Sequence, residues 1–138
     1  MHVIYGDNNM MKKLCILIYS AIVAFPAFGD DGPKLELNTL TQAEAVCRMT
    51  FTTQSAVGIE KLTTEMVLFD KLGSVLLLTL FDFQDFPAGK LRVRQFDIPD
   101  TNCAELGQVL INGVHECVGQ GCAPLTVETR VDSVEVLG

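Results

Sequence analysis

Apolar and polar residues alternate along most of the chain after residue 30. In residues 45–54, Cys47, Met49 and Phe51 alternate with polar side chains, which predicts a strand with one buried face. Similar short runs, separated by clusters of Gly, Pro and Asp, cover residues 35–38, 62–69, 75–83, 91–97, 108–114 and 125–131, and residues 134–137 close the chain. Helical periodicity is nearly absent. The pattern predicts an all-β domain of about seven strands, an immunoglobulin-like or fibronectin type III-like sandwich.

Two of these strands carry expectations about their place in a sheet. Residues 35–38 follow Gly32-Pro33 and are expected to form a first edge strand. The run Val75-Leu76-Leu77-Leu78 is too apolar for a strand that has one face in water. Both of its faces should be covered, which makes it either a central strand of the sandwich or a strand that a partner chain covers.

The first 29 residues have the order of features that a secretory signal peptide requires. Two lysines precede an apolar run over residues 14–28, and Ala27-Phe28-Gly29 supplies a small-x-small cleavage site. The run is shorter than the roughly 20 apolar residues of a membrane-spanning helix, and a serine and a proline interrupt it. We therefore expect residues 1–29 to be an N-terminal extension with a cleaved signal peptide. Residues 30–138 are expected to form a single secreted or periplasmic domain.

The chain is acidic, with 17 Asp and Glu residues against 10 Lys and Arg residues and a net charge of −7. Cleavage after Gly29 removes Lys12, Lys13 and Asp7, which leaves 8 basic and 16 acidic residues and a net charge of −8. Nucleic acids and anionic membrane surfaces favour proteins with clustered Lys and Arg. Neither is expected as a partner of the mature chain.

Four of the five cysteines lie after the predicted leader, namely Cys47, Cys103, Cys117 and Cys122. An even number of cysteines in an exported chain predicts two disulfide bonds. Four cysteines allow three pairings. The spacing favours Cys117 with Cys122, which flank a turn-prone, glycine-containing segment, and this leaves Cys47 and Cys103 as partners by elimination.

No arrangement of residues in the sequence indicates an enzyme. The mature chain has one histidine, His115, and lacks the motifs of serine hydrolases, zinc proteases and phosphate-binding loops. A zinc site made of His115, Cys117 and Cys122 is disfavoured because thiols in an exported chain tend to pair. Paired catalytic carboxylates are disfavoured because aspartates are common on an acidic surface; the candidates are Asp82, Asp85, Asp97 and Asp100. We expect no catalytic residue, no metal and no cofactor.

Two further groups of side chains have alternative interpretations. Arg92 and Arg94 are two residues apart in a predicted strand, so their guanidinium groups should project in the same direction. A solvated face paired with nearby aspartates is the simpler interpretation, and recognition of an acidic ligand is the alternative. The four later phenylalanines are expected first in the core and second on a contact surface; they are Phe81, Phe83, Phe86 and Phe96.

Four segments carry a resemblance to a known family. They are Cys47-Arg48-Met49-Thr50-Phe51, Leu80-Phe81-Asp82-Phe83, Arg92-Val93-Arg94-Gln95-Phe96-Asp97 and Val109-Leu110-Ile111-Asn112-Gly113. In these segments, and over residues 35–137 as a whole, the sequence resembles a family of small exported proteobacterial proteins with a fibronectin type III-like domain. The resemblance implies a domain-swapped dimer that is similar in shape to cytokine receptor ectodomains and binds host interleukins. No motif of the family identifies ligand-contact residues in this chain.

The leader, the strand pattern and the resemblance together favour a secreted, non-enzymatic binding protein that binds host interleukins and modulates immunity. A homodimer is expected under this hypothesis. The alternative is an exported structural or assembly protein such as a fimbrial-type subunit. Fimbrial subunits usually carry a penultimate tyrosine, whereas this chain ends in Val136-Leu137-Gly138. A periplasmic inhibitor or stress protein is a third class, for which the sequence contains no specific feature.

Overall fold

Eight strands and one short 3₁₀ helix follow one another in a computed structural model that describes residues 23–24 and 32–138. They are β1 (Lys34–Ala43), β2 (Val46–Gln54), β3 (Ile59–Asp70), β4 (Val75–Phe86), β5 (Arg92–Ile98), η1 (Cys103–Glu105), β6 (Leu106–Val118), β7 (Thr126–Thr129) and β8 (Glu135–Leu137). The predicted cleavage site after Gly29 lies outside the described residues. Within those residues, no helix has the length and apolarity needed to cross a membrane.

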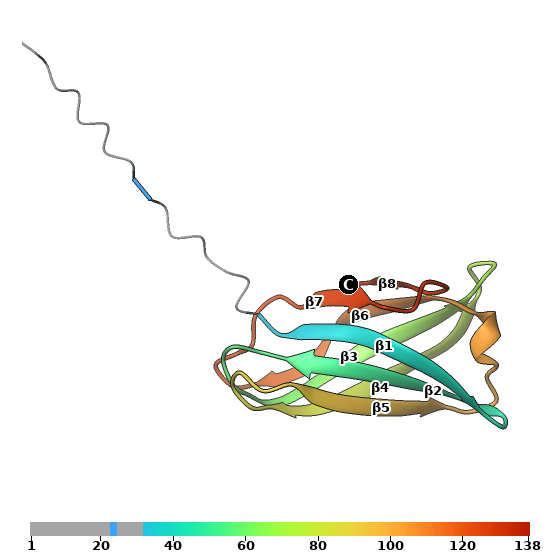
Figure 1. Cartoon of the computed structure of the whole chain (residues 1–138), viewed down its shortest axis with the longest axis horizontal. Coiled ribbons are helices and arrows are strands. Elements are labelled where there is room, and N and C mark those ends of the chain that lie inside the picture. Colours follow the sequence, from blue (N-terminus) through green and yellow to red (C-terminus); the bar gives the residue numbers. More distant parts are fainter. Residues whose placement is uncertain (1–22, 25–31) are drawn as a thin grey trace, which may run out of the picture.

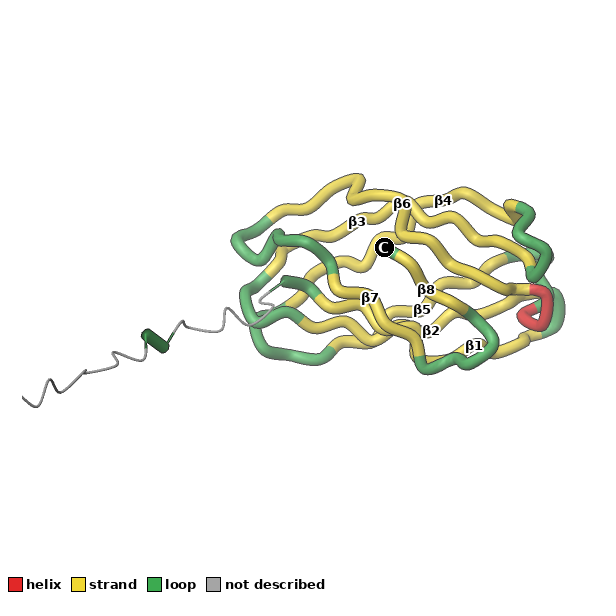
Figure 2. The backbone as a smooth tube through the Cα atoms, turned by 90° about the horizontal axis from the view of Figure 1, so that it is seen from above, coloured by secondary structure: helices red, strands yellow, loops and turns green. Residues whose placement is uncertain are grey.

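The strands form two sheets of four that pack face to face. One sheet has the order β5-β2-β1-β7 and the other has the order β4-β3-β6-β8. Neighbouring strands are antiparallel, except that β7 runs parallel to β1 and β8 runs parallel to β6. Figure 1 shows β4 and β5 along one side of the sandwich and β7 and β8 along the other, and Figure 2 gives the perpendicular view. The prediction of an all-β sandwich is confirmed.

One expectation about strand position is wrong, and one of two alternatives for another strand is excluded. The first predicted strand is not at an edge, because β1 lies between β2 and β7. The apolar run that begins at Val75 is not in a central strand, because β4 forms one edge of its sheet. In both cases the position depends on which distant segment pairs with the strand, and an alternation pattern contains no information on pairing partners.

The core consists of the inward-facing side chains of both sheets. Cys47, Met49 and Phe51 of β2 are completely buried, as their alternation predicted. On the side where β4 and β5 meet, Phe51 joins a cluster of four aromatic rings together with Phe81, Phe83 and Phe96. The rings of Phe81 and Phe96 are stacked with centroids 4.0 Å apart, so the cluster links β4 of one sheet to β5 of the other. Of the predicted set, Phe81, Phe83 and Phe86 are buried, and Phe96 packs against the core.

The chain changes sheets between β7 and β8, which is why the structure has eight strands where about seven are predicted. The backbone N–H of Arg130 donates to Leu37 O at 2.9 Å, just beyond the end of β7. A turn follows, in which the backbone N–H of Val134 donates to Val131 O at 3.1 Å. Val134 is buried in the core, and β8 then pairs with β6 in the opposite sheet. The last segment therefore closes one side of the sandwich.

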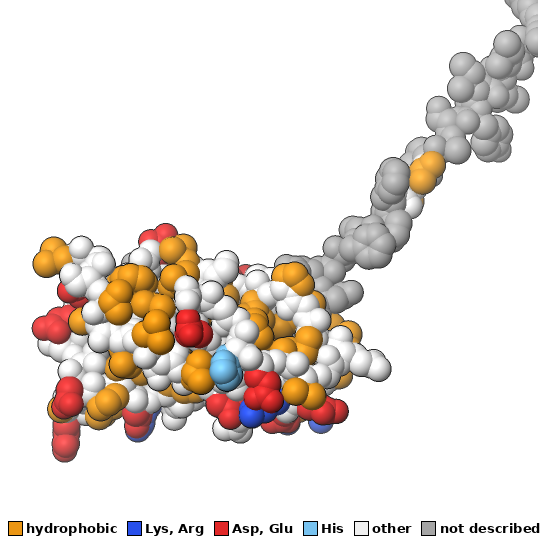
Figure 3. All heavy atoms as spheres, turned by 180° about the vertical axis from the view of Figure 1, so that it is seen from behind, with side chains coloured by type: hydrophobic (Ala, Val, Ile, Leu, Met, Phe, Trp, Pro, Cys, Tyr) orange, Lys and Arg blue, Asp and Glu red, His pale blue; other side chains and the backbone are white. Residues whose placement is uncertain are grey.

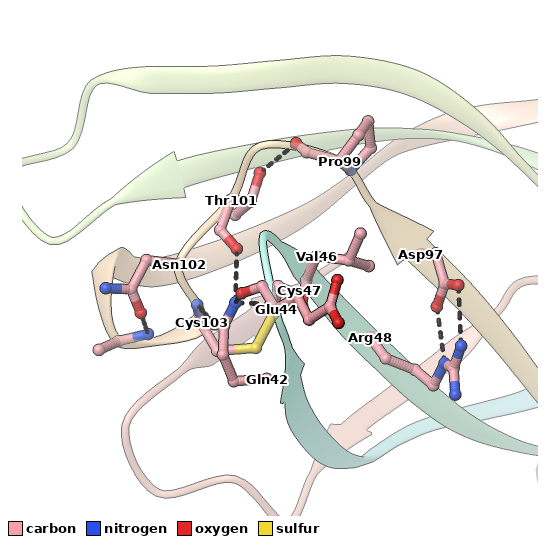
Figure 4. The surroundings of a disulfide bond; sticks show 11 residues. Gln42, Glu44, Val46, Cys47, Arg48, Asp97, Pro99, Thr101, Asn102 and Cys103 are labelled. Atoms are coloured by element: carbon pink, nitrogen blue, oxygen red, sulfur yellow. Dashed lines mark hydrogen bonds and ion pairs between the residues drawn. A yellow bond between two sulfur atoms is a disulfide. The ribbon is translucent and has the colours of Figure 1, made fainter.

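Both predicted disulfide bonds are present. Cys47 is bonded to Cys103, with 56 residues of separation, and Cys117 is bonded to Cys122, with 5. Figure 4 shows the longer bridge, which ties β2 to the short helix η1. The Gln42 side chain reinforces this tie, because its Oε1 accepts a hydrogen bond from Cys103 N at 2.7 Å and its Nε2 donates to Val46 O at 3.1 Å. The two bridges are compatible with a secreted or periplasmic protein.

Candidate functional site

The four aspartates considered as catalytic candidates do not come together. Asp97 pairs with Arg48 on the outer side of β2 and β5, and Asp85 pairs with Arg94. The carboxylate of Asp82 accepts a hydrogen bond from the backbone N–H of Gln84, within its own strand. Asp100 lies in the loop after β5. Three of the four carboxylates thus make local contacts, two in ion pairs and one with the backbone of its own strand.

The candidate zinc ligands do not form a metal site. Cys117 and Cys122 are bonded to each other, so neither offers a thiolate to a metal. His115 is exposed on β6. Among residues 32–138, no three His, Cys, Asp or Glu side chains form a group that could hold a metal ion.

The Arg48–Asp97 pair is the clearest electrostatic feature that the figures show (Figure 4). Arg48 Nε and Nη2 donate to Asp97 Oδ1 and Oδ2 at 2.7 and 2.9 Å, which is a two-pronged contact. These hydrogen bonds lower the pKa of Asp97 below its ordinary value of 3.8. Both side chains are about half exposed, so solvent screens the pair and its effect on stability is small.

This pair predicts a pH dependence. Because the folded state lowers the pKa of Asp97, the ionised carboxylate stabilises the fold above the pKa of the unfolded chain. That stabilisation disappears as the pH falls through the folded-state pKa. Asp97→Asn should lower the melting temperature slightly at pH 7, and its difference from the parent protein should shrink as the pH is lowered toward about 2. Thermal melts of both proteins, with Asp132→Asn as a control, test this. A difference that is equally large at both pH values would contradict it.

The outer face of the β5-β2-β1-β7 sheet is polar and its charges are paired. Lys34 Nζ lies 2.8 Å from Glu128 Oε2, and Arg130 Nε lies 3.0 Å from Glu36 Oε1. A groove of about 310 Å³ runs beside these pairs and is also lined by Asn38 and Thr52. Because its cations already face carboxylates, the groove offers little net charge to a ligand.

The outer face of the opposite sheet carries a row of apolar side chains next to a polar pair, in which Asn112 donates a hydrogen bond to Glu65. Val67, Leu78 and Leu110 lie side by side on β3, β4 and β6, because Val67 pairs with both of the others. Val67 is 6% exposed but does not belong to the buried core cluster. Phe69 and Leu80 extend the same surface along β3 and β4. We call these five residues the outer apolar face.

Two leucines of the outer apolar face are unusually exposed for side chains of an edge strand. Leu78 is 58% exposed and Leu80 is 47% exposed, and both belong to edge strand β4. Val75 and Leu76 continue the exposed apolar run toward the turn that joins β3 to β4. Figure 3 looks onto this sheet and shows the hydrophobic side chains that gather on it. Large exposed apolar patches mark interaction surfaces in soluble proteins.

The edge of β4 has a covered half and an open half. In the covered half, Arg94 of β5 reaches across from the other sheet, and its Nε donates to Phe83 O at 2.7 Å. Its Nη2 donates to the backbone oxygen and the carboxylate of Asp85, at 3.0 and 3.1 Å. In residues 32–138, no side chain of the other sheet makes such a bond to the backbone of residues 75–81. Arg94 therefore protects one half of the edge from pairing and leaves the other half free.

This contact corrects the interpretation of the arginine pair as a solvated face. The Arg94 side chain is 15% exposed and lies on the inward side of β5, between the two sheets. The predicted pairing with a nearby aspartate is confirmed by the contact with Asp85. The alternation of β5 places Arg92 and Arg94 on one side, as predicted, but only the fold shows that this side meets β4.

The sequence indicates only part of this surface. Residues 75–78 are too apolar for a strand with one face in water, and cover by a partner chain is the alternative that remains once β4 is placed at an edge. No pattern in the sequence indicates a role for Val67, Phe69 or Leu110. Their outward position depends on the register of β3 with β4 and β6, which includes irregularities that alternation alone does not reveal.

Comparisons with known proteins show a likeness of fold. No family model matches the chain, and no curated protein matches it. Among solved structures, IrmA from Escherichia coli is similar, with a TM-score of 0.54 and 12% sequence identity over 70% of this chain and 90% of that protein. The likeness shows a shared fold. This shared fold agrees with the sandwich that the sequence resemblance implied.

Proposed function

We propose that this protein is an exported, non-enzymatic binding protein that recognises host interleukins through its outer apolar face and thereby modulates immunity. The observation that carries the proposal is the exposure of Leu78 and Leu80 beside Val67, Phe69 and Leu110 on an otherwise acidic domain. A surface of this kind stabilises a complex by removing apolar area from water. Its polar surroundings keep the free protein soluble.

The choice of an interleukin as the ligand rests on the sequence resemblance. The likeness to IrmA supports a related sandwich fold. Membership of that family is part of the proposal. The two disulfides support export, because such bonds persist in oxidising compartments. Binding by a rigid, cross-linked sandwich requires no cofactor, and the proposal includes none.

Leu110→Glu tests the site. Leu110 lies on β6, separated from the β4 edge by β3, so the substitution alters the outer apolar face and leaves the edge intact. We expect the parent protein to bind at least one member of a panel of purified interleukins at micromolar concentration or below in surface plasmon resonance. A charge in the apolar contact should weaken this binding at least about tenfold.

Val114→Glu is the matched control, because Val114 lies on the same strand β6 but pairs with the inward-facing Thr64, outside the outer apolar face. It should bind the same interleukin as the parent protein does. Absence of binding by the parent protein to every interleukin in the panel would contradict the proposed ligand class. Unchanged binding by Leu110→Glu would contradict the proposed site.

The open edge of β4 also favours the alternative of a fimbrial-type assembly protein, since strand addition to an open edge is how such subunits associate. The two functions predict different assemblies. A subunit that adds head to tail forms an open series of sizes, whereas a binding protein forms a closed complex. Sedimentation velocity at increasing protein concentration distinguishes them, and a series of species beyond the dimer would support the assembly function.

A further inference from the structure

We propose that the open half of the β4 edge pairs with the same edge of a second copy of this chain, in antiparallel orientation about a twofold axis at Leu78. The two β4-β3-β6-β8 sheets would then form one continuous sheet of eight strands. This interface is centred on the backbone edge of β4 and shares Leu78 and Leu80 with the outer apolar face, whose other members lie on β3 and β6 away from the edge.

The first argument is the extent of the open edge. It begins after the turn at residues 70–74, where the Asp70 carboxylate accepts hydrogen bonds from Leu72 N and Ser74 N. It ends before Phe83, where Arg94 binds the backbone oxygen. Residues 75–81 lie between these limits, and Leu78 is their midpoint. An antiparallel pair centred on Leu78 therefore matches the whole open segment with itself.

The second argument is the identity of the facing side chains. Directly opposed residues of an antiparallel pair lie on the same face of the sheet. With Leu78 on the twofold axis, Leu76 faces Leu80 of the second copy, so exposed leucines meet on the outer side. On the inner side, Leu77 faces Thr79 of the second copy. Residues 73–81 contain no charged residue, so the pairing places no charge inside the contact.

The third argument is the charge at the two ends of the segment. Lys71 precedes it and takes part in no ion pair among residues 32–138, and Asp82 follows it. Antiparallel pairing brings Lys71 of each copy toward Asp82 and Asp85 of the other. The chain carries a net charge of −7, so most of its surface opposes self-association. This segment combines an uncharged strand with complementary ends, which is the self-complementarity that a twofold interface requires.

A cysteine cross-link tests the register directly. Opposed residues of an antiparallel pair have Cα atoms about 4.5–5.5 Å apart, which is within the range that a disulfide spans. Leu78→Cys should therefore give a covalent dimer under oxidising conditions, visible on a non-reducing gel, and mass spectrometry should locate the bond between the two introduced thiols. Leu80→Cys is the control, because in this register its two copies lie about 14 Å apart. It should remain uncross-linked.

A second pair of variants tests the interface without new thiols. The full chain, expressed with its own N-terminal segment and purified in its exported form, should be a dimer in light scattering at concentrations up to about 100 µM. Leu78→Lys, which places two like charges opposite each other, should give the monomer mass with an unchanged circular dichroism spectrum. Lys71→Glu and Asp82→Lys should each weaken the dimer, and the double variant should restore it.

The outcomes that overturn the proposal are specific. A parent protein that stays monomeric at all these concentrations would overturn it, as would equal cross-linking of Leu78→Cys and Leu80→Cys. A dimer that persists in Leu78→Lys would also overturn it and would indicate association by another route, such as exchange of a strand between chains. Leu110→Glu should remain dimeric, so failure of ligand binding and failure of dimerisation are distinguished.

Discussion

Replacing Cys47 and Cys103 together with alanine should lower the free energy of unfolding by about 4 kcal/mol. The bridge closes a loop that spans 56 residues of separation, and without it the unfolded chain gains most of the entropy that this cross-link removes. Cys47 is also completely buried beside the core, so the variant loses packing as well. Urea unfolding followed by circular dichroism measures the change.

The second bridge provides the comparison. Replacing Cys117 and Cys122 with alanine opens a loop of only 5 residues of separation, and on the same entropy estimate it should cost about 2 kcal/mol. Both variants should retain the strand content of the parent protein under native conditions. If the loss from the short bridge equals or exceeds that from the long one, the long bridge is not the main covalent stabiliser of this sandwich.

Phe51→Ala should destabilise the protein by about 3–5 kcal/mol. Phe51 is fully buried, and its ring centroid lies 5.4 Å from that of Phe83 and 6.0 Å from that of Phe96. The substitution removes the ring that contacts both sheets on the side where β4 and β5 meet, so it leaves a cavity and breaks three edge-to-face contacts. The denaturant midpoint should fall while the slope of the transition stays the same.

Two further variants separate this effect from a general loss of apolar area. Phe51→Leu keeps most of the buried volume and should cost clearly less than the alanine variant. Leu72→Ala removes an apolar side chain that is 93% exposed at the turn between β3 and β4, and it should change the free energy of unfolding by less than about 0.5 kcal/mol. Equal losses from Phe51→Ala and Leu72→Ala would contradict the role of the aromatic cluster.

The aromatic cluster and the β4 edge are physically connected. Phe81 and Phe83 anchor the inner side of β4, and Arg94 holds its covered half against β5. The open half thus extends from a rigid base. A rigid strand loses little conformational entropy when another strand pairs with it, which favours association at this edge.

Features that depend on local interactions could be predicted from the sequence. Features that depend on contacts between distant segments could not. The alternation in residues 45–54 correctly predicted β2 and its buried face, because side chains of a strand alternate between faces whatever the strand pairs with. Cysteine spacing correctly predicted both bridges, because a bond across a short turn is constrained by the local chain.

Other features depended on contacts between distant segments. β1 lies inside its sheet because β7 pairs with it in parallel, and β4 lies at an edge because β5 pairs with β2 of the other sheet. Arg94 is partly buried because β5 approaches β4. Its guanidinium group bonds there to Phe83, which lies eleven residues earlier in the sequence. Residues 75–78 alone indicated part of the exposed apolar surface. The other members of the outer apolar face could not be found without the register of β3 with β4 and β6.

The order of residues was sufficient to establish an all-β domain, two disulfides and one strand too apolar to be left in water. Periodicity, composition and cysteine spacing are local properties, and local geometry follows from them. Folding was needed to show that this strand lies at an edge, that Arg94 closes half of the edge, and that Val67, Phe69 and Leu110 share its outer face. These facts depend on strand order and register, which many weak contacts between distant residues select together.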